Sequence, residues 1–252
     1  MFFSHCNMRC LYCQNYRWSQ QHEGKPLRET QLVSLLESLY AGGCHNWNLV
    51  TPAPWLPHIE TALDTLRGRD IRLPVVYNTS GYESVTTLAA ADEWTDIYLT
   101  DLRYADPVTA AEGSQAADYV SVAREALLHM WRRKGTLETD DGDIALRGVI
   151  CRILVLPGRA GEALANLHWL AHHAGTEIAV SLMAQYTPAW QARERLGWDR
   201  SLTEEEYLQV SDGMTELGFT NGWIQDVETA AAAPLLGYNM QAAAPPPELA
   251  AG

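Results

Sequence analysis

Short runs of β-branched and aromatic residues alternate along the chain with longer segments whose apolar positions recur at the period of a helix. The short runs predict strands at residues 1–4, 46–50, 73–78, 96–101, 148–155 and 177–182, with a further short strand at 223–225. The longer segments predict helices at residues 30–41, 55–66, 84–91, 116–134, 161–174 and 203–217. This alternation is typical of an α/β fold, in which helices cover a parallel sheet.

The patterned part of the chain ends before its last two dozen residues. Residues 1–228 are long enough to form one domain around a single core. Residues 229–252 are rich in Ala and Pro and lack an apolar period, so we expect a poorly ordered tail there.

Charge and hydropathy narrow the range of partners. The chain carries 31 acidic and 18 basic residues, a net charge of −13, which disfavours nucleic acid or an anionic membrane as a partner. No apolar run reaches the roughly 18 residues of a membrane span. The first residues lack the basic segment and apolar core of a signal peptide. We therefore expect a cytoplasmic protein.

Three of the five cysteines lie within eight residues. Cys6, Cys10 and Cys13 have the spacing C-x3-C-x2-C, and in a reducing compartment such clustered thiols are more often metal ligands than disulfides. Three thiolates can hold a [4Fe–4S] cluster and leave one iron open to another ligand. A structural zinc site needs four ligands, for which His5 and His22 are the nearest further candidates. The spacing favours the cluster, with zinc or coincidence as the alternatives.

Residues 3–15, Phe-Ser-His-Cys-Asn-Met-Arg-Cys-Leu-Tyr-Cys-Gln-Asn, resemble the cluster loop of the radical S-adenosylmethionine superfamily, and especially its pyruvate formate-lyase-activating-enzyme-like branch. The likeness continues at residues 49–52, 77–82, 96–103 and 154–158, each near the end of a predicted strand. The resemblance implies an open partial (β/α)6 barrel of the TIM type with parallel strands, followed by a C-terminal helix.

The resemblance also implies an activity and its cofactors. It implies an oxidoreductase that reductively cleaves S-adenosylmethionine at a [4Fe–4S] cluster, giving a 5′-deoxyadenosyl radical that abstracts hydrogen. The implied partners are an electron donor such as flavodoxin or ferredoxin and a glycyl-radical enzyme as substrate, with a small metabolite or a peptide as the alternative. A non-catalytic iron–sulfur module for electron transfer or sensing is the alternative of another class. It is disfavoured because an electron carrier has no need of nucleotide-binding strand ends.

The resemblance assigns three residues to S-adenosylmethionine near the cysteine loop. Tyr12 would offer an aromatic face to the adenine, or else pack the loop as a core residue. Asp101 and Arg103 are two apart at the end of a strand and so face the same side. The family pattern there is Asp-x-Lys, and Arg103 would replace a point charge with a bidentate fork for the methionyl carboxylate. The alternative for this pair is an ordinary ion pair at the rim.

Three further strand ends complete the expected nucleotide site. Arg152 would bind a carboxylate or the substrate, or form a structural ion pair. Asn78 would bind the ribose, although Asn before Ser-Gly also favours a turn. Many superfamily members carry Gly-Gly-Glu-Pro at the second strand, whereas this chain has Val-Thr-Pro-Ala-Pro. The Thr51 hydroxyl and nearby carbonyls would then accept the methionyl ammonium.

The substrate cavity is expected beyond the nucleotide. Gln185 and Tyr186 follow the predicted strand at 177–182, and we expect them to line this cavity without touching the cluster. Packing of the core is the alternative for both. Trp18, Trp55 and Trp190 lie near predicted loops and are further candidates for the lining.

Overall fold

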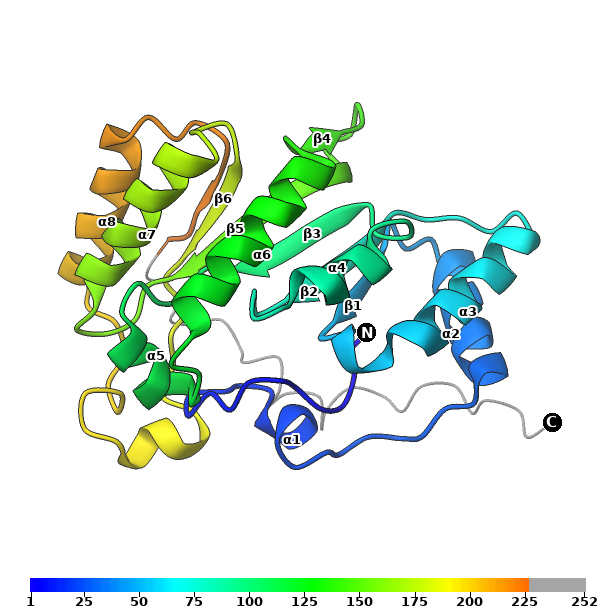
Figure 1. The fold of residues 1–252 in the computed structure, drawn as a ribbon, viewed down its shortest axis with the longest axis horizontal. Coiled ribbons are helices and arrows are strands. Elements are labelled where there is room, and N and C mark those ends of the chain that lie inside the picture. The colour runs from blue at the N-terminus through cyan, green and yellow to red at the C-terminus, as the bar shows by residue number, and fades with distance from the viewer. Residues whose placement is uncertain (227–252) are drawn as a thin grey trace.

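A computed structural model describes residues 1–226, and a mainly parallel sheet runs through their centre (Figure 1). Six strands lie in the order β1, β2, β3, β5, β6, β7, each parallel to the next, and β4 pairs with β5 in the antiparallel sense. Their bounds are β1 Trp47–Val50, β2 Val75–Thr79, β3 Ile97–Asp101, β4 Glu138–Thr139, β5 Ala145–Leu154, β6 Ala179–Met183 and β7 Gly222–Ile224. The order ends at β1 and β7, so the sheet is open over the described residues.

Helices alternate with the strands and cover the outer face of the sheet. Figure 1 shows one pair at either end of the sheet, α2 with α3 and α7 with α8, and α4 with α6 between them. Their bounds are α2 Glu29–Ala41, α3 Leu56–Gly68, α4 Val85–Ala91, α6 Tyr119–Lys134, α7 Ala160–His173 and α8 Glu204–Glu216. The predicted α/β fold with an open, parallel, partial barrel is confirmed. No helix of the described part has the length and apolar character needed to cross a membrane.

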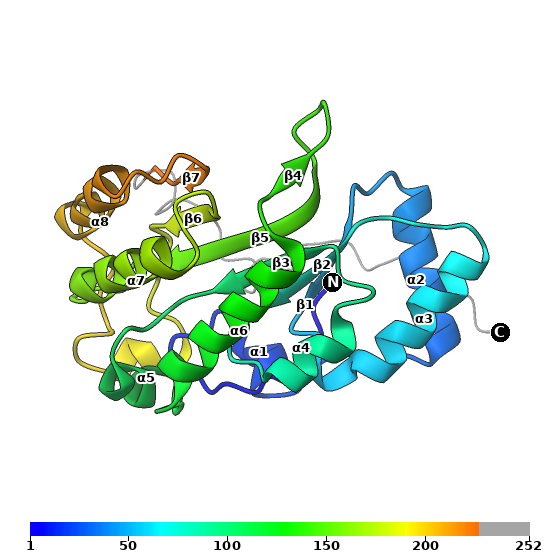
Figure 2. The same ribbon diagram turned by 45° about the horizontal axis from the view of Figure 1, so that its top comes forward.

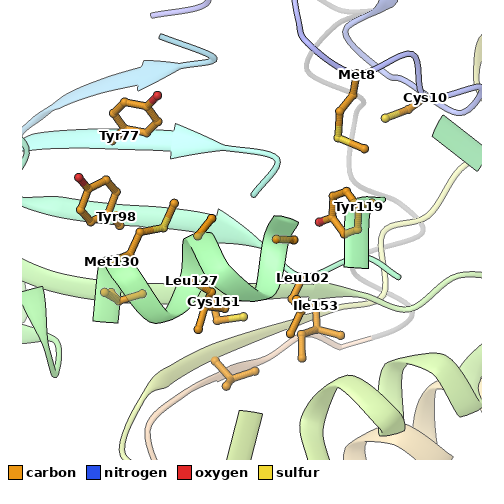
Figure 3. Packing of buried hydrophobic residues seen from close by; sticks show 14 of the residues in the cluster. Met8, Cys10, Tyr77, Tyr98, Leu102, Tyr119, Leu127, Met130, Cys151 and Ile153 are labelled. Carbon is orange, nitrogen blue, oxygen red and sulfur yellow. The ribbon is translucent and has the colours of Figure 1, made fainter. Parts of the chain in front are cut away.

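Burial alternates along β1 and along most of β6, and it separates the two faces of the sheet there. In β6, Val180 and Leu182 are buried under helices, whereas Ser181 and Met183 between and beyond them are partly exposed. Figure 3 shows Tyr77, Tyr98 and Cys151 in the apolar core together with residues of α6. The core therefore lies between sheet and helices, and the opposite, concave face remains available for a site.

The structure adds two helices that the pattern did not predict, the short helix α1 (Tyr16–Ser19) and α5 (Pro107–Ser114). Helix α5 lies against the N-terminal segment (Figure 1), whose Arg9 and Leu11 N–H groups donate to its last carbonyls. Its local start signal is present, because the Asp106 side chain accepts a hydrogen bond from the Val108 N–H and Pro107 is the first helical residue. The helix has only eight residues, many of them small, so no apolar period marks it.

Other boundaries also differ from the predictions. Residues 1–4 form one isolated bridge, Phe2 to Val50, and not a strand. The predicted helix at 116–134 begins at Tyr119. Strand β5 starts earlier than predicted because its first residues form a hairpin with β4, which projects from the sheet (Figure 2). Two short 3-10 helices, η1 (Ala53–Trp55) and η2 (Trp190–Glu194), were not predicted. The predicted tail at 229–252 lies outside the described residues.

One carboxyl group is buried behind the loop that follows β2. Glu83 is 5% exposed and accepts a hydrogen bond of 2.8 Å from the Thr79 hydroxyl. Burial raises the pKa of Glu83 to about 7. The folded chain therefore holds this proton more tightly than the unfolded chain, in which the pKa of a Glu carboxyl is about 4.3. The resulting stabilisation is complete below that value and is lost as the pH rises through about 7.

We therefore expect Glu83→Gln to stabilise the protein in a pH-dependent manner. In urea unfolding, the variant should gain about 1–3 kcal/mol over the wild type at pH 8 and clearly less at pH 5, because the amide cannot ionise. Glu60→Gln, on the exposed face of α3, is the matched control and should show no such trend. A gain that is the same at both pH values would contradict this account.

Candidate functional site

The cysteine loop, residues 6–13, lies across the carboxyl ends of the strands. The Asn7 side-chain amide donates to the carbonyl of Tyr82, which follows β2. The Gln14 amide donates to the carbonyl of Gln185, which follows β6, at 3.4 Å. Figure 3 shows the loop residue Met8 above Tyr119, the first residue of α6, with Cys10 further to the side. The loop thus occupies the rim where parallel βα units carry their sites.

Helix α5 and η2 fix the backbone of this loop. The Leu11 N–H donates to the Gly113 carbonyl at 2.9 Å, and the Arg9 N–H donates to the Ser114 carbonyl at 3.3 Å. On the other side, the Ala192 N–H donates to the Leu11 carbonyl at 2.9 Å. The last residues of α5 therefore supply carbonyl acceptors for a loop more than a hundred residues earlier in the chain. Sequence reasoning missed this support.

Tyr12 lies inside an aromatic cluster at the base of the loop. Its ring stacks on Trp198 with centroids 5.4 Å apart and also lies 5.6 Å from the Tyr186 ring. Its hydroxyl is 2.7 Å from that of Tyr104, and the residue is only 6% exposed. A Cβ on Gly113 would lie 2.6 Å from Trp198 and 2.7 Å from the Tyr104 hydroxyl, so this packing requires glycine. Tyr12 is a packing residue here, and its contact with adenine stays a prediction.

The donor set of the loop suits a cluster. Burial raises the pKa of the Cys6 thiol to about 11 and also raises that of Cys13, and bound metal cations would counter this by favouring the thiolates. Among residues 1–226, no three His, Cys, Asp or Glu side chains are arranged to hold a single metal ion. The rings of His5 and His22, the further candidates for a zinc site, stack on each other with centroids 4.0 Å apart. Three thiols from one loop fit the cysteine ligation of an iron–sulfur cluster, whereas a structural zinc site needs four ligands.

Four of the predicted residues meet at the rim, in what we call the Asp101 network. Asp101 accepts hydrogen bonds from Arg103 Nε at 2.9 Å and from Arg152 Nε at 2.6 Å. Arg152 also donates to Asn78 Oδ1 at 2.9 Å, and Arg103 Nη1 lies 3.0 Å from Cys10 Sγ. The parallel register of β3 and β5 explains the contact between Asp101 and Arg152, because it sets these two residues opposite each other. The network thus joins β2, β3, β5 and the cysteine loop.

Charge in the network favours an anionic ligand. Burial alone would raise the pKa of Asp101, but the Arg152 and Arg103 guanidinium groups lower it below its usual range. Burial would likewise lower the pKa of Arg103, yet Asp101 holds it well above the ordinary value. One carboxylate faces two guanidinium groups, which leaves one positive charge in excess. Guanidinium forks at such a place are suited to a carboxylate.

Thr51 lies beside this network at the end of β1. Its backbone has a left-handed φ of 58°, which is uncommon for a β-branched residue and occurs often at functional sites. Its N–H donates to the Asn78 carbonyl at 2.8 Å, while the Asn78 amide donates to Asn48 Oδ1 at 3.1 Å. Thr51 and Asn78 are therefore neighbours, and their roles toward a nucleotide stay predictions.

Two residues that sequence reasoning did not single out hold the network in place. The Tyr119 hydroxyl accepts from the Arg103 N–H at 3.1 Å and lies 2.8 Å from the Ser80 carbonyl. Gly81 has a φ of 82°, and a Cβ there would collide with the Asp101 carbonyl. The Ser-Gly pair was visible as a turn signal, whereas nothing local marked Tyr119.

Gln185 and Tyr186 lie next to the cysteine loop. Tyr186 is 4% exposed, and its hydroxyl donates to the Trp198 carbonyl at 2.7 Å, so it packs the loop in this structure. Gln185 is partly exposed, and its carbonyl accepts from Gln14. That the two line a substrate cavity stays a prediction.

The predicted tryptophans fall in different places. Trp18 and Trp55 line a pocket of about 500 Å³ that also includes Phe3 and His5, just before the cysteine loop. Trp190 is absent from this lining and stacks on Tyr16 with centroids 5.8 Å apart.

Sequence comparison finds one distant relative. The chain is 26% identical over 213 residues to the uncharacterized protein MJ0674 of Methanocaldococcus jannaschii. The match covers 82% of this chain but only 58% of the relative, so the chain spans less than two thirds of that protein's length. No family model matches the chain.

Comparison with solved structures shows the fold. SuiB of Streptococcus suis bound to S-adenosylmethionine superposes with a TM-score of 0.59 at 11% identity, over 91% of this chain and 51% of SuiB. HydG, a maturase of the [FeFe]-hydrogenase, superposes with a TM-score of 0.54 at 14% identity, over 88% of this chain and 50% of HydG. A domain of a pyruvate-formate lyase-activating enzyme from Bacteroides vulgatus gives a TM-score of 0.46 at 15% identity, over 68% of this chain and 93% of that domain. The chain therefore has the fold shared by SuiB and HydG, the first of which binds S-adenosylmethionine.

Proposed function

We propose that this protein is a radical S-adenosylmethionine enzyme that binds a [4Fe–4S] cluster through Cys6, Cys10 and Cys13. The observation that supports this most is the position of Arg103, which contacts the Cys10 sulfur and the Asp101 carboxylate at once. It sets three candidate metal ligands directly beside cations that suit the carboxylate of an amino-acid ligand.

The chemistry would come from the cofactors, and the protein would supply binding and orientation. When bound, the cluster supplies the electron that cleaves S-adenosylmethionine to a 5′-deoxyadenosyl radical, which abstracts hydrogen from the substrate. An external donor such as flavodoxin or ferredoxin would deliver that electron. The cysteine loop is suited to this because its backbone is fixed by α5 and η2.

Each residue of the rim has a role in the proposal. Arg103 and Arg152 bind the methionyl carboxylate, and Asp101 orients both guanidinium groups. Asn78 binds the ribose. Thr51, with nearby backbone carbonyls, accepts the methionyl ammonium in place of the acidic residue that many superfamily members have there.

The finer proposal concerns the substrate. The likeness of residues 3–15 to the activating-enzyme-like branch favours the α-hydrogen of a glycine in a partner glycyl-radical enzyme, with a peptide or small metabolite as the alternative. Gln185, partly exposed beside the loop, would face that substrate. A candidate labelled with deuterium at the reacting carbon should transfer the label into 5′-deoxyadenosine, and a label left in place excludes that candidate.

Anaerobic reconstitution tests the cluster and the cleavage together. We expect about four irons per chain and, with dithionite and S-adenosylmethionine, formation of 5′-deoxyadenosine. Cys10→Ala should lose both. Cys44→Ala, which removes a cysteine outside the loop, is the matched control and should keep both. A chain that holds four irons but forms no 5′-deoxyadenosine would instead be an electron-transfer or sensing module.

Substitution of Arg103 tests the anion site. Arg103→Ala should weaken binding of S-adenosylmethionine by about 1–3 kcal/mol, the scale of a charge-assisted hydrogen bond, with iron content unchanged. Equilibrium binding to the reconstituted protein measures this. Arg147→Ala, which breaks an exposed ion pair with Glu138 in the β4–β5 hairpin, is the control. Unchanged affinity in Arg103→Ala would reduce Arg103 to a structural ion pair.

A further inference from the structure

Three buried hydroxyl groups form a continuous line that ends on a cysteine of the loop. The Tyr12 hydroxyl lies 2.7 Å from that of Tyr104, which lies 2.6 Å from the Ser114 hydroxyl. Ser114 in turn donates to Cys10 Sγ at 3.0 Å. We call Tyr12, Tyr104 and Ser114 the hydroxyl chain.

The number of hydrogens decides which group donates in each hydrogen bond of the hydroxyl chain. Each hydroxyl group has a single hydrogen to donate. Because Ser114 gives its hydrogen to Cys10, it must accept from Tyr104, and Tyr104 must then accept from Tyr12. All three hydroxyl dipoles therefore point toward the sulfur atom, an arrangement in which each bond polarises and strengthens the next.

Burial makes these hydrogen bonds strong and keeps them in place. Tyr104 is 0% exposed and Ser114 is 1% exposed, so water does not compete for them. Ser114 is also the last residue of α5, and its carbonyl accepts from the Arg9 N–H of the cysteine loop. The Ser114 carbonyl thus holds the backbone of the loop, while its hydroxyl bonds the Cys10 sulfur of the same loop.

We propose that Ser114, with Tyr104 and Tyr12 behind it, sets the reduction potential of the cluster by donating to the Cys10 thiolate. This rests on the proposed function. A one-electron donor adds one negative charge to the cluster, and no proton is transferred. Donors at the sulfur stabilise the more negative, reduced form and so raise the potential. Ser114 and Tyr104 are positioning residues that act through Cys10 and do not touch the substrate.

A redox titration of the reconstituted full-length chain with dithionite, followed by electron paramagnetic resonance without S-adenosylmethionine, tests this. Ser114→Ala should disfavour reduction about tenfold, which lowers the midpoint potential by about 59 mV for a one-electron couple. Tyr104→Phe should lower it by a smaller amount. The double variant should match Ser114→Ala alone, because Tyr104 reaches the sulfur only through Ser114. Tyr207→Phe, which removes a buried hydroxyl bonded to the Leu182 carbonyl, is the control and should leave the midpoint potential unchanged.

The outcomes separate this inference from the proposed function. A wild-type chain that holds no iron overturns the cluster and this inference with it. An intact cluster whose potential is unchanged in Ser114→Ala overturns the inference alone. If Ser114→Ala loses the cluster, Tyr104→Phe decides, because it keeps the serine and its bond to the sulfur. A Tyr104→Phe chain with full iron content and an unshifted potential is then the contrary result.

Discussion

A single buried carboxylate organises the rim of this protein. Asp101 is 5% exposed and lies between the guanidinium groups of Arg103 and Arg152, so its charge is compensated on both sides. Loss of the Asp101 carboxylate would leave both guanidinium groups without their counter-charge at a largely buried site, which is strongly unfavourable. The carboxylate therefore constrains β3 and β5 and, through Arg103, the cysteine loop. The geometry of the candidate site depends on this compensation.

Cys10 lies where two polar systems meet. From one side it receives the Arg103 guanidinium, which belongs to the Asp101 network, and from the other the Ser114 hydroxyl. The first brings a positive charge to the position proposed for S-adenosylmethionine, and the second brings a neutral donor held by α5. One cysteine sulfur thus couples the proposed nucleotide site to the apolar aromatic core around Tyr12 and Trp198.

Two glycines make this density of contacts sterically feasible. Gly81 lets the turn after β2 approach the Asp101 carbonyl, and Gly113 lets α5 approach Trp198 and the Tyr104 hydroxyl. A side chain at either position would displace a group that the site uses. Backbone close approach, more than any single strong bond, brings the loop, α5 and the strand ends within hydrogen-bonding distance.

The sequence by itself determined the alternation of strands and helices, the three-cysteine loop and the strand ends that carry Asn78, Asp101 and Arg152, because periodicity and close spacing are local properties. Only the tertiary structure decided which groups meet. The Cys10 sulfur contacts Arg103 and Ser114, which are 93 and 104 residues away along the chain. Helix α5 has no apolar period, and the burial of Tyr12 depends on a tryptophan near residue 200. Such contacts follow from how distant segments pack, which no local pattern encodes.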